Sequence, residues 1–186
     1  MQVIKFKSVK ILAHYLLLIS IFAIVFTANL LSYRPDYIYR CIRVIDGDTI
    51  IVSRSGRSLR IRFAYIDAPE SSQKSFDKVP IGKNATYFLK QFIEGKKVKI
   101  KIIDLDLYGR TIGVVFYENQ SVNKFMVENG HAIYYDSNTL PDIRLSEYRA
   151  KMKRLGIWRT DGFLNPKKFR KDKTRITTGL KEIGGY

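Results

Sequence analysis

The chain of 186 residues has a single cysteine and two histidines. One cysteine excludes a disulfide framework within the chain and any site built from several thiolates. The histidines, His14 and His131, lie far apart in the sequence, which argues against a histidine-rich zinc site. Acidic residues are also scarce, with 17 Asp and Glu against 33 Lys and Arg, so the formal charge is +16. This excess of cations indicates an anionic partner, either nucleic acid or a membrane surface.

Charged residues are absent between Lys10 and Arg34. As a helix, the apolar residues 11–31 would reach about 30 Å, which matches the hydrocarbon thickness of a bilayer. Residues 1–10 form a basic flank without an acidic side chain. The pattern fits an uncleaved transmembrane anchor or a secretory signal that is removed. The length of the run and the poor cleavage site near Ala28 favour the anchor.

The remaining residues contain enough apolar side chains for one folded domain of ordinary size, since the whole chain is 46% hydrophobic. We expect a linker at 32–37, a folded domain at 38–160 and a basic, disordered tail at 161–186. The alternation of apolar and polar residues predicts five strands and the helical spacing predicts three helices, which together indicate an α+β fold with an OB-type five-stranded β-barrel. The predicted strands are 38–45, 49–54, 58–66, 97–103 and 111–117, and the predicted helices are 83–94, 121–129 and 141–155.

Two turns in this domain decide where its carboxylates lie. If Ser55-Gly56 is a two-residue turn, position 48 faces position 63 across the hairpin. Asp48, Arg62 and Asp67 then lie toward one end of that hairpin. Two close carboxylates repel unless a cation lies between them, and oxygen ligands without His or Cys favour Ca²⁺ or Mg²⁺ over zinc. Taken alone, Asp46-Gly47-Asp48 and Asp67-Ala68-Pro69-Glu70 are also ordinary turn sequences.

Arg110 lies in Tyr108-Gly109-Arg110, at the start of the last predicted strand. It is either a solvated residue or, with Arg62, part of a phosphate site, because the guanidinium fork matches phosphate oxygens. Within the predicted strand 111–117, Ile112, Val114 and Phe116 are expected to face inward. His131 reads as a structural residue, and Tyr134 or Tyr135 could line a base or sugar pocket.

Taken in order, the motifs I-D-G-D-T, R-x4-D-A-P-E, Y-G-R, N-G-H-A and G-I-W resemble the staphylococcal nuclease (thermonuclease) family over roughly residues 38–160. By this resemblance Asp48 and Asp67 bind calcium, joined by the backbone carbonyl of Ala68. Arg62 and Arg110 clamp the phosphate, and Glu70 activates or orients the attacking water. Asp46 lies near the metal, Tyr108 belongs to a nucleotide pocket, and Leu107 stands where the best-known members carry Lys.

The resemblance implies a calcium-dependent phosphodiesterase, an endo- or exonuclease, that hydrolyses DNA and RNA without sequence specificity and leaves 3′-phosphate ends. Lys74 and Lys78 are further expected substrate contacts, beside Tyr108, Tyr134 and Tyr135. We expect a monomeric domain without an obligate protein partner, held on the non-cytoplasmic side of a membrane by residues 11–31. The alternatives are a secreted protein or a mitochondrial membrane. The rival functions are a non-catalytic OB-barrel binding module and a membrane-bound scaffold.

Overall fold

The computed structural model describes residues 14–27, 37–135 and 141–183. The chain divides into two units, with the boundary after Pro35. In the first unit, residues 14–27 form a helix with exposed side chains. Among the described ranges, no helix combines the length and the apolar character needed to cross a bilayer. The predicted anchor at 11–31 and the predicted linker at 32–37 both extend into residues outside this description.

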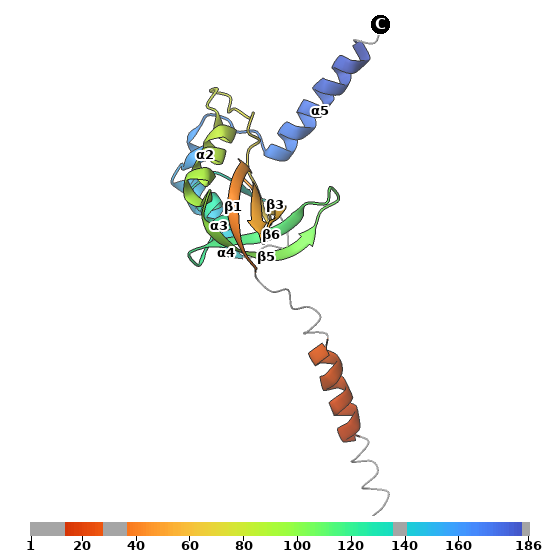
Figure 1. The fold of residues 1–186 in the computed structure, drawn as a ribbon. Helices are drawn as coiled ribbons and strands as arrows, with labels where there is room; N and C mark the ends of the chain where they lie inside the picture. Colours follow the sequence, from red (N-terminus) through yellow and green to blue (C-terminus); the bar gives the residue numbers. More distant parts are fainter. Residues whose placement is uncertain (1–13, 28–36, 136–140, 184–186) are drawn as a thin grey trace, which may run out of the picture. The chain divides into compact units, whose positions relative to one another are not determined.

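The second unit is built on a closed barrel of five strands. Their order is β3-β2-β1-β5-β6, and a parallel pairing of β3 with β6 closes the barrel (Figure 1). The predicted OB-type barrel is therefore confirmed. The strands are β1 (Tyr37–Asp46), β2 (Thr49–Arg54), β3 (Arg57–Phe63), β5 (Lys97–Leu105) and β6 (Thr111–Tyr117).

The hairpin register is the one predicted from Ser55-Gly56. Arg54 pairs with Arg57 and Thr49 with Arg62, so position 48 lies opposite position 63. The N–H of Phe63 donates to the Asp48 carbonyl at 2.8 Å. This register brings the turn between β1 and β2 beside the end of β3, where the site lies.

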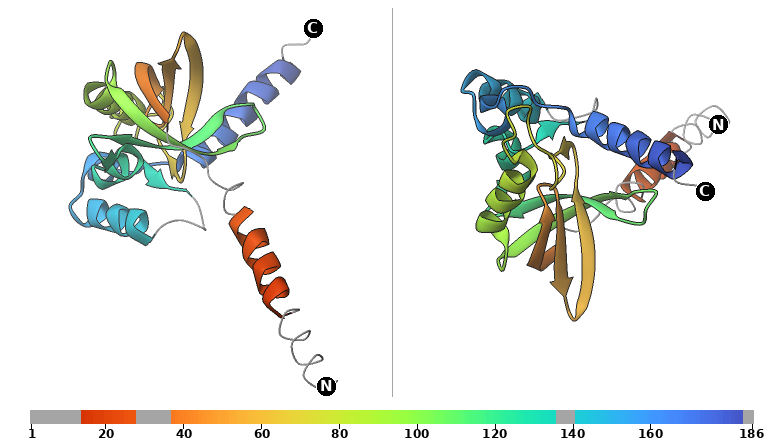
Figure 2. Two further views of the ribbon diagram at one scale, coloured as in Figure 1. Left: turned by 60° about the horizontal axis from the view of Figure 1, so that its bottom comes forward. Right: turned by 90° about the horizontal axis from the view of Figure 1, so that it is seen from above.

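Helices and short strands complete the domain around the barrel, and the last helix extends away from it (Figure 2). The barrel interior and the buried face of α2 form one apolar core, in which Ile50, Ile61, Leu89 and Ile100 are fully buried. The helical elements are α2 (Ile81–Ile93), α3 (Val122–Glu128), α4 (Pro141–Met152), the 3-10 helix η1 (Gly156–Arg159) and α5 (Pro166–Ile183), and the short strands are β4 (Ile66–Asp67), β7 (Gln120–Ser121) and β8 (Ile133–Tyr134).

The predicted strand 58–66 is broken in the structure. Tyr65 has a φ of 69°, which is unusual for a residue with a side chain, and β4 begins after it. The break interrupts the alternation along β3, so that Phe63, Ala64 and Ile66 are all buried. As a consequence Asp67 also faces the interior of the domain, with no exposed surface.

The inward face of β6 is the opposite of the predicted one. Val115 is fully buried, whereas Ile112, Val114 and Phe116 are only partly buried. Gly113 explains the choice, since a Cβ there would lie 3.1 Å from the Ile100 side chain. The close packing of β6 on β5 therefore favours glycine on the inner face.

The predicted disordered tail contains a helix. α5 spans Pro166–Ile183 and begins with a side-chain cap, because the Asn165 side chain accepts a hydrogen bond from the N–H of Lys167 at 2.9 Å. Asn at the cap followed by Pro in the first turn is a strong helix-start signal. Within α5, Pro166 is buried and Phe169 and Arg170 are half-buried, whereas Lys167 and Lys168 are exposed.

Candidate active site

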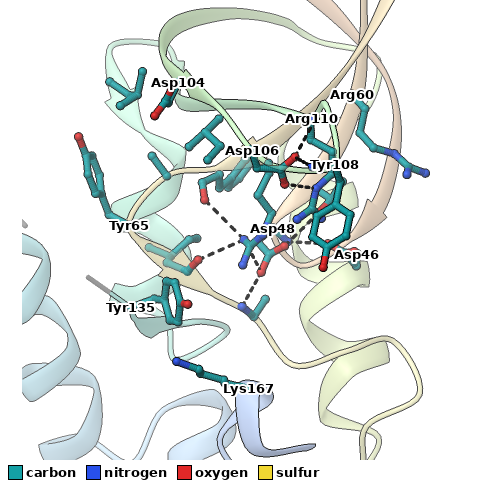
Figure 3. A pocket seen from close by; sticks show the side chains of 18 of the residues that line it. Asp46, Asp48, Arg60, Tyr65, Asp104, Asp106, Tyr108, Arg110, Tyr135 and Lys167 are labelled. Atoms are coloured by element: carbon teal, nitrogen blue, oxygen red, sulfur yellow. Dashed lines mark hydrogen bonds and ion pairs between the residues drawn. The ribbon is translucent and has the colours of Figure 1, made fainter. Parts of the chain in front are cut away.

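A large cavity opens at the β1–β2 turn, beside the C-terminal end of β3 (Figure 3). Asp48 lies in its centre, Asp106, Tyr108 and Arg110 lie on one side, and Tyr135 and Lys167 lie on another. No histidine or cysteine is among the lining residues, which include Asp46, Asp48, Arg60, Arg62, Ala68, Glu70, Asp106, Tyr108, Arg110, Tyr135, Lys167 and Arg170.

Asp48 is held by the turn between β1 and β2 and by the chain after β4. Its Oδ2 accepts a hydrogen bond from the N–H of Ala68 at 2.6 Å, and its own N–H donates to Asp46 Oδ1 at 3.0 Å. Only 5% of its surface is exposed. Burial raises the pKa of the Asp48 carboxyl, the Arg62 charge opposes this, and the neighbouring acid Asp46 adds to it. The carboxylate form therefore depends on a nearby cation.

Arg62 is that cation, and it joins the two predicted metal ligands. Its Nη1 lies 2.7 Å from Asp48 Oδ2, and its Nη2 lies 2.8 Å from Asp67 Oδ1. Nη1 also donates to the carbonyl of Ile66 at 3.1 Å. Asp48 and Asp67 thus flank one guanidinium, which brings together three residues that the sequence predicts in one site.

Glu70 lies in the loop after β4, and that loop is fixed by two inward contacts. The buried Gln73 accepts a hydrogen bond from the N–H of Glu70 at 3.3 Å and donates to the carbonyl of Leu164. At the start of α2, Gly82 lies so close that a Cβ would come within 1.7 Å of the Glu70 carbonyl oxygen. The loop therefore rests directly on the helix, with the Glu70 side chain at the cavity.

Arg110 enters the cavity from the β5–β6 connection. Its Nε lies 2.6 Å from Asp106 Oδ2, and its backbone N–H donates to Asp106 Oδ1. Desolvation alone would raise the pKa of Asp106, but the hydrogen bonds from Arg110 and Tyr108 outweigh it and lower the pKa. Asp106 therefore stays ionised and positions Arg110, a role that the sequence analysis did not assign to it.

Three of the predicted substrate contacts are not among the lining residues. Lys74 and Lys78 are exposed on the loop before α2, and Tyr134 packs against the core. Tyr135 and Tyr108 do line the cavity, with 49% and 86% of their surface exposed. The predicted Ala68 carbonyl contact stays a prediction, since the recorded contact of Ala68 to the site is its N–H.

Arg170 of α5 is the site residue that the sequence analysis missed. Its Nη2 lies 2.9 Å from Asp67 Oδ2, and its Nη1 lies 2.8 Å from Glu70 Oε1. Burial acts to lower the pKa of this guanidinium, but its bonds to Asp67 and Glu70 outweigh that and raise it. The Asn165-Pro166 helix start was the available signal for α5, whereas nothing in the sequence pairs residue 170 with residue 67.

The fit of this site to a divalent cation depends on its carboxylates. Within 14–27, 37–135 and 141–183, no three His, Cys, Asp or Glu side chains are placed to hold an ion. Yet Asp48 and Asp67 are two buried carboxylates that pair with the guanidinium groups of Arg62 and Arg170. Such oxygen donors suit Ca²⁺ or Mg²⁺, with water and substrate oxygens completing the coordination. The residues fit a hard divalent ion, provided that an arginine yields its place on Asp67.

Comparison with known proteins places this geometry in a family. A family model described as "Staphylococcal nuclease homologue" matches residues 60–160. The chain belongs to the staphylococcal nuclease family. It is 31% identical over 134 residues to a protein named "Thermonuclease" from Staphylococcus hyicus, which covers 69% of this chain and 79% of that protein.

Two further relatives of this family member come from enteric bacteria. A protein from Escherichia coli named "Uncharacterized endonuclease" is 37% identical over 121 residues, which is 64% of this chain and 75% of that protein. A protein from Shigella flexneri named "Micrococcal nuclease" is 32% identical over 154 residues, which is 76% of this chain and 85% of that protein. The family match ends at residue 160, so Arg170 and α5 lie beyond it.

Proposed function

We propose that this chain is a hydrolytic nuclease that cleaves phosphodiester bonds of DNA and RNA with the help of Ca²⁺. The observation that carries this is the Asp48–Arg62–Asp67 cluster. Asp48 and Arg62 line the same cavity as Arg110 and Glu70, and Asp67 is buried behind them in contact with Arg62. The nuclease names of the relatives support the reaction class. A mere binding module has no need to gather two arginines and three carboxylates in one cavity, which argues against the non-catalytic alternative.

The residues of this chain would divide the work of hydrolysis. Asp48 and Asp67 would hold the ion, which when bound would polarise the phosphodiester and neutralise its charge. Arg62 and Arg110 would bind the phosphoryl oxygens and stabilise the charge that builds on them. Glu70 would orient the attacking water and accept its proton. The water oxygen forms a bond to phosphorus, the bond to the 5′ oxygen breaks, and that oxygen takes up a proton, which leaves a 3′-phosphate end.

The substrate is proposed to be recognised without sequence readout. Tyr108 and Tyr135 offer exposed rings at the cavity, and aromatic rings stack on any base. Exposed lysines on β5, Lys97, Lys99 and Lys101, supply general attraction for a phosphate backbone. We further propose that residues 11–31 anchor the chain in a membrane, with the nuclease domain on the non-cytoplasmic side.

A nuclease assay on the full chain tests the reaction and its metal. Single-stranded DNA labelled at one end should be degraded with Ca²⁺ present, and degradation should stop when a calcium chelator is added. Products with 3′-phosphate ends should accept no nucleotide from a terminal transferase until a phosphatase has treated them. Undiminished cutting in chelator would refute the calcium requirement.

Glu70→Gln tests the role of the carboxylate in the loop. The variant should bind DNA normally and cut on the order of 10²–10⁴ times more slowly, because the amide accepts no proton. Glu118→Gln is the matched control, since Glu118 is exposed in the turn after β6 and does not line the cavity. Wild-type rates for Glu70→Gln would remove general-base work from this residue.

A further inference from the structure

Arg170 occupies the same carboxylate oxygens that a divalent ion would need. Its Nη2 bonds Asp67 Oδ2 at 2.9 Å and its Nη1 lies 3.2 Å from Asp67 Oδ1, which also accepts from Arg62 at 2.8 Å. Both oxygens of this fully buried carboxylate are therefore engaged by guanidinium groups. A metal ion can reach Asp67 only if one of these bonds is given up.

The same guanidinium also holds Glu70. Its Nη1 bonds Glu70 Oε1 at 2.8 Å, so one side chain engages a predicted metal ligand and the predicted water-orienting carboxylate together. Within the described residues, the hydrogen bonds and ion pairs of Arg62 go to Asp48, to Asp67 and to the carbonyls of Phe63 and Ile66, and none of them goes to Glu70. Arg170 thus occupies oxygen atoms of both Asp67 and Glu70, the predicted metal ligand and the predicted water-orienting residue.

Arg170 is the more easily displaced of the two arginines. Its side chain is 41% exposed against 15% for Arg62, and it lies on a helix whose described neighbours are mostly exposed. In Figures 1 and 2 the first turns of α5 lie by the barrel and the rest of the helix extends away from it. Among residues 166–174 of α5 only Pro166 is buried, whereas Arg62 lies on β3 in the wall of the barrel.

The segment before α5 stays attached when Arg170 moves. Buried Gln73 donates to the carbonyl of Leu164, and the same side chain accepts from the N–H of Glu70. This contact fixes the start of α5 beside the Glu70 loop, and Arg170, on the first turns of the helix, is held by its ion pairs with Asp67 and Glu70. Residues 164–183 thus form an arm that is attached to the domain at Leu164 and that carries Arg170 on its helix.

We propose that Arg170 is a built-in competitor of the divalent cation, so that α5 lowers the apparent metal affinity and holds the nuclease inactive until the arm is displaced. This inference rests on the proposed calcium dependence. The apparent affinity of a ligand is its intrinsic affinity multiplied by the fraction of protein that can bind it. If Arg170 stays on Asp67 about nine-tenths of the time, about one-tenth of the protein can bind the ion and the apparent affinity falls about tenfold.

Calorimetric titration of the full chain with Ca²⁺, without nucleic acid, tests this directly. Arg170→Gln should bind Ca²⁺ about tenfold more tightly than wild type. Arg170→Lys should fall between them, because an ammonium group cannot engage Asp67 and Glu70 with a planar fork. The matched control is Lys168→Gln, which removes the same charge from an exposed position of the same helix and should bind Ca²⁺ as wild type does.

The outcomes separate the competition from the function on which it rests. Equal affinity in wild type and Arg170→Gln, or weaker binding by Arg170→Gln, would overturn the competition alone. A tenfold gain in Lys168→Gln as well would also overturn it, since the effect would then be one of general charge. If none of the four proteins bound Ca²⁺, the calcium step of the proposed function would fail, and the competition with it.

Discussion

At the scale of single residues, the site depends on the balance of charge between two buried carboxylates and the arginine between them. Asp48 and Asp67 expose 5% and 0% of their surface, and Arg62 lies between them. A buried charge left without its partner is strongly unfavourable, whereas a balanced cluster costs far less. Arg62 therefore has two roles, since the residue proposed to bind phosphate also pairs with both buried acids and opposes the rise in the pKa of Asp48.

Replacing Arg62 by Gln should therefore damage both stability and activity. We expect the free energy of unfolding to fall by about 3–5 kcal/mol, the usual cost of leaving a buried charge unpaired. We expect the rate of DNA cleavage to fall on the order of 10³-fold, by analogy with arginines that stabilise phosphoryl transfer. Urea denaturation and the nuclease assay measure the two effects.

Arg57→Gln is the control for this substitution, because Arg57 lies exposed at the start of the same strand, outside the cavity. It should change neither stability nor rate noticeably. If Arg62→Gln unfolded at the wild-type urea concentration, Arg62 would not stabilise the two acids and the charge-balance argument would be wrong.

At the scale of elements, the sequence predicts the barrel and the hairpin that carries the site. The Ser55-Gly56 turn leaves one register that keeps Ile50, Val52 and Ile61 inside, so local turn chemistry and the hydrophobic pattern agree. A slip of one residue would turn every side chain to the other face. For this reason the sequence predicts that Asp48 and Arg62 lie close together.

The elements that the sequence does not predict depend on contacts between distant segments. The inward face of β6 follows from the close approach of Gly113 to Ile100, which no local pattern contains. The position of α5 follows from the pairing of Arg170 with Asp67 and Glu70, about a hundred positions away. Phe169, Ile176, Leu180 and Ile183 recur at helical spacing, so the helix itself has a signal in the sequence, whereas its docking by charge has none.

One contact between elements has a consequence for catalysis. Gly82 of α2 supports the Glu70 loop, and a Cβ would lie 1.7 Å from the Glu70 carbonyl oxygen and 3.0 Å from Cα of Ser71. The helix cannot retreat, because Ala85 and Leu89 are fully buried in the core. In Gly82→Ala the loop must therefore shift. A shift of about 1 Å at a catalytic group can cost about 10²-fold in rate.

We expect Gly82→Ala to lower kcat about 10²-fold while the helical circular dichroism remains. Lys83→Ala is the control at the next, exposed position of the same helix, and it should keep the wild-type kcat. A wild-type kcat for Gly82→Ala would show that the position of the Glu70 loop does not limit the reaction.

At the scale of the whole molecule, stability depends on groups far from the cavity. His131 lies between α3 and β8 and stacks on the Phe88 ring, with centroids 4.1 Å apart. Burial lowers its pKa from 6.5 to about 4, so the folded protein holds this imidazole neutral. The sequence-based view of His131 as a structural residue agrees with this packing.

The lowered pKa of His131 predicts how stability depends on acid. Above pH 6.5 the imidazole is neutral in both states and its contribution to stability is fully present. Between pH 6.5 and about 4 the unfolded chain binds a proton that the folded protein does not. The free energy of unfolding therefore decreases as the pH is lowered, by up to about 1.4 kcal/mol per pH unit. Below about pH 4 both states are protonated and this loss ends.

His131→Phe keeps a ring against Phe88 but binds no proton, so the difference in stability between variant and wild type should grow in the variant's favour from pH 6.5 down to 4. Urea denaturation of both proteins across that range measures the difference in stability. Taking this difference cancels the contribution of the carboxylates, because they titrate equally in both proteins. A constant difference would mean that His131 is protonated in the folded protein and that its packing does not exclude the charged form.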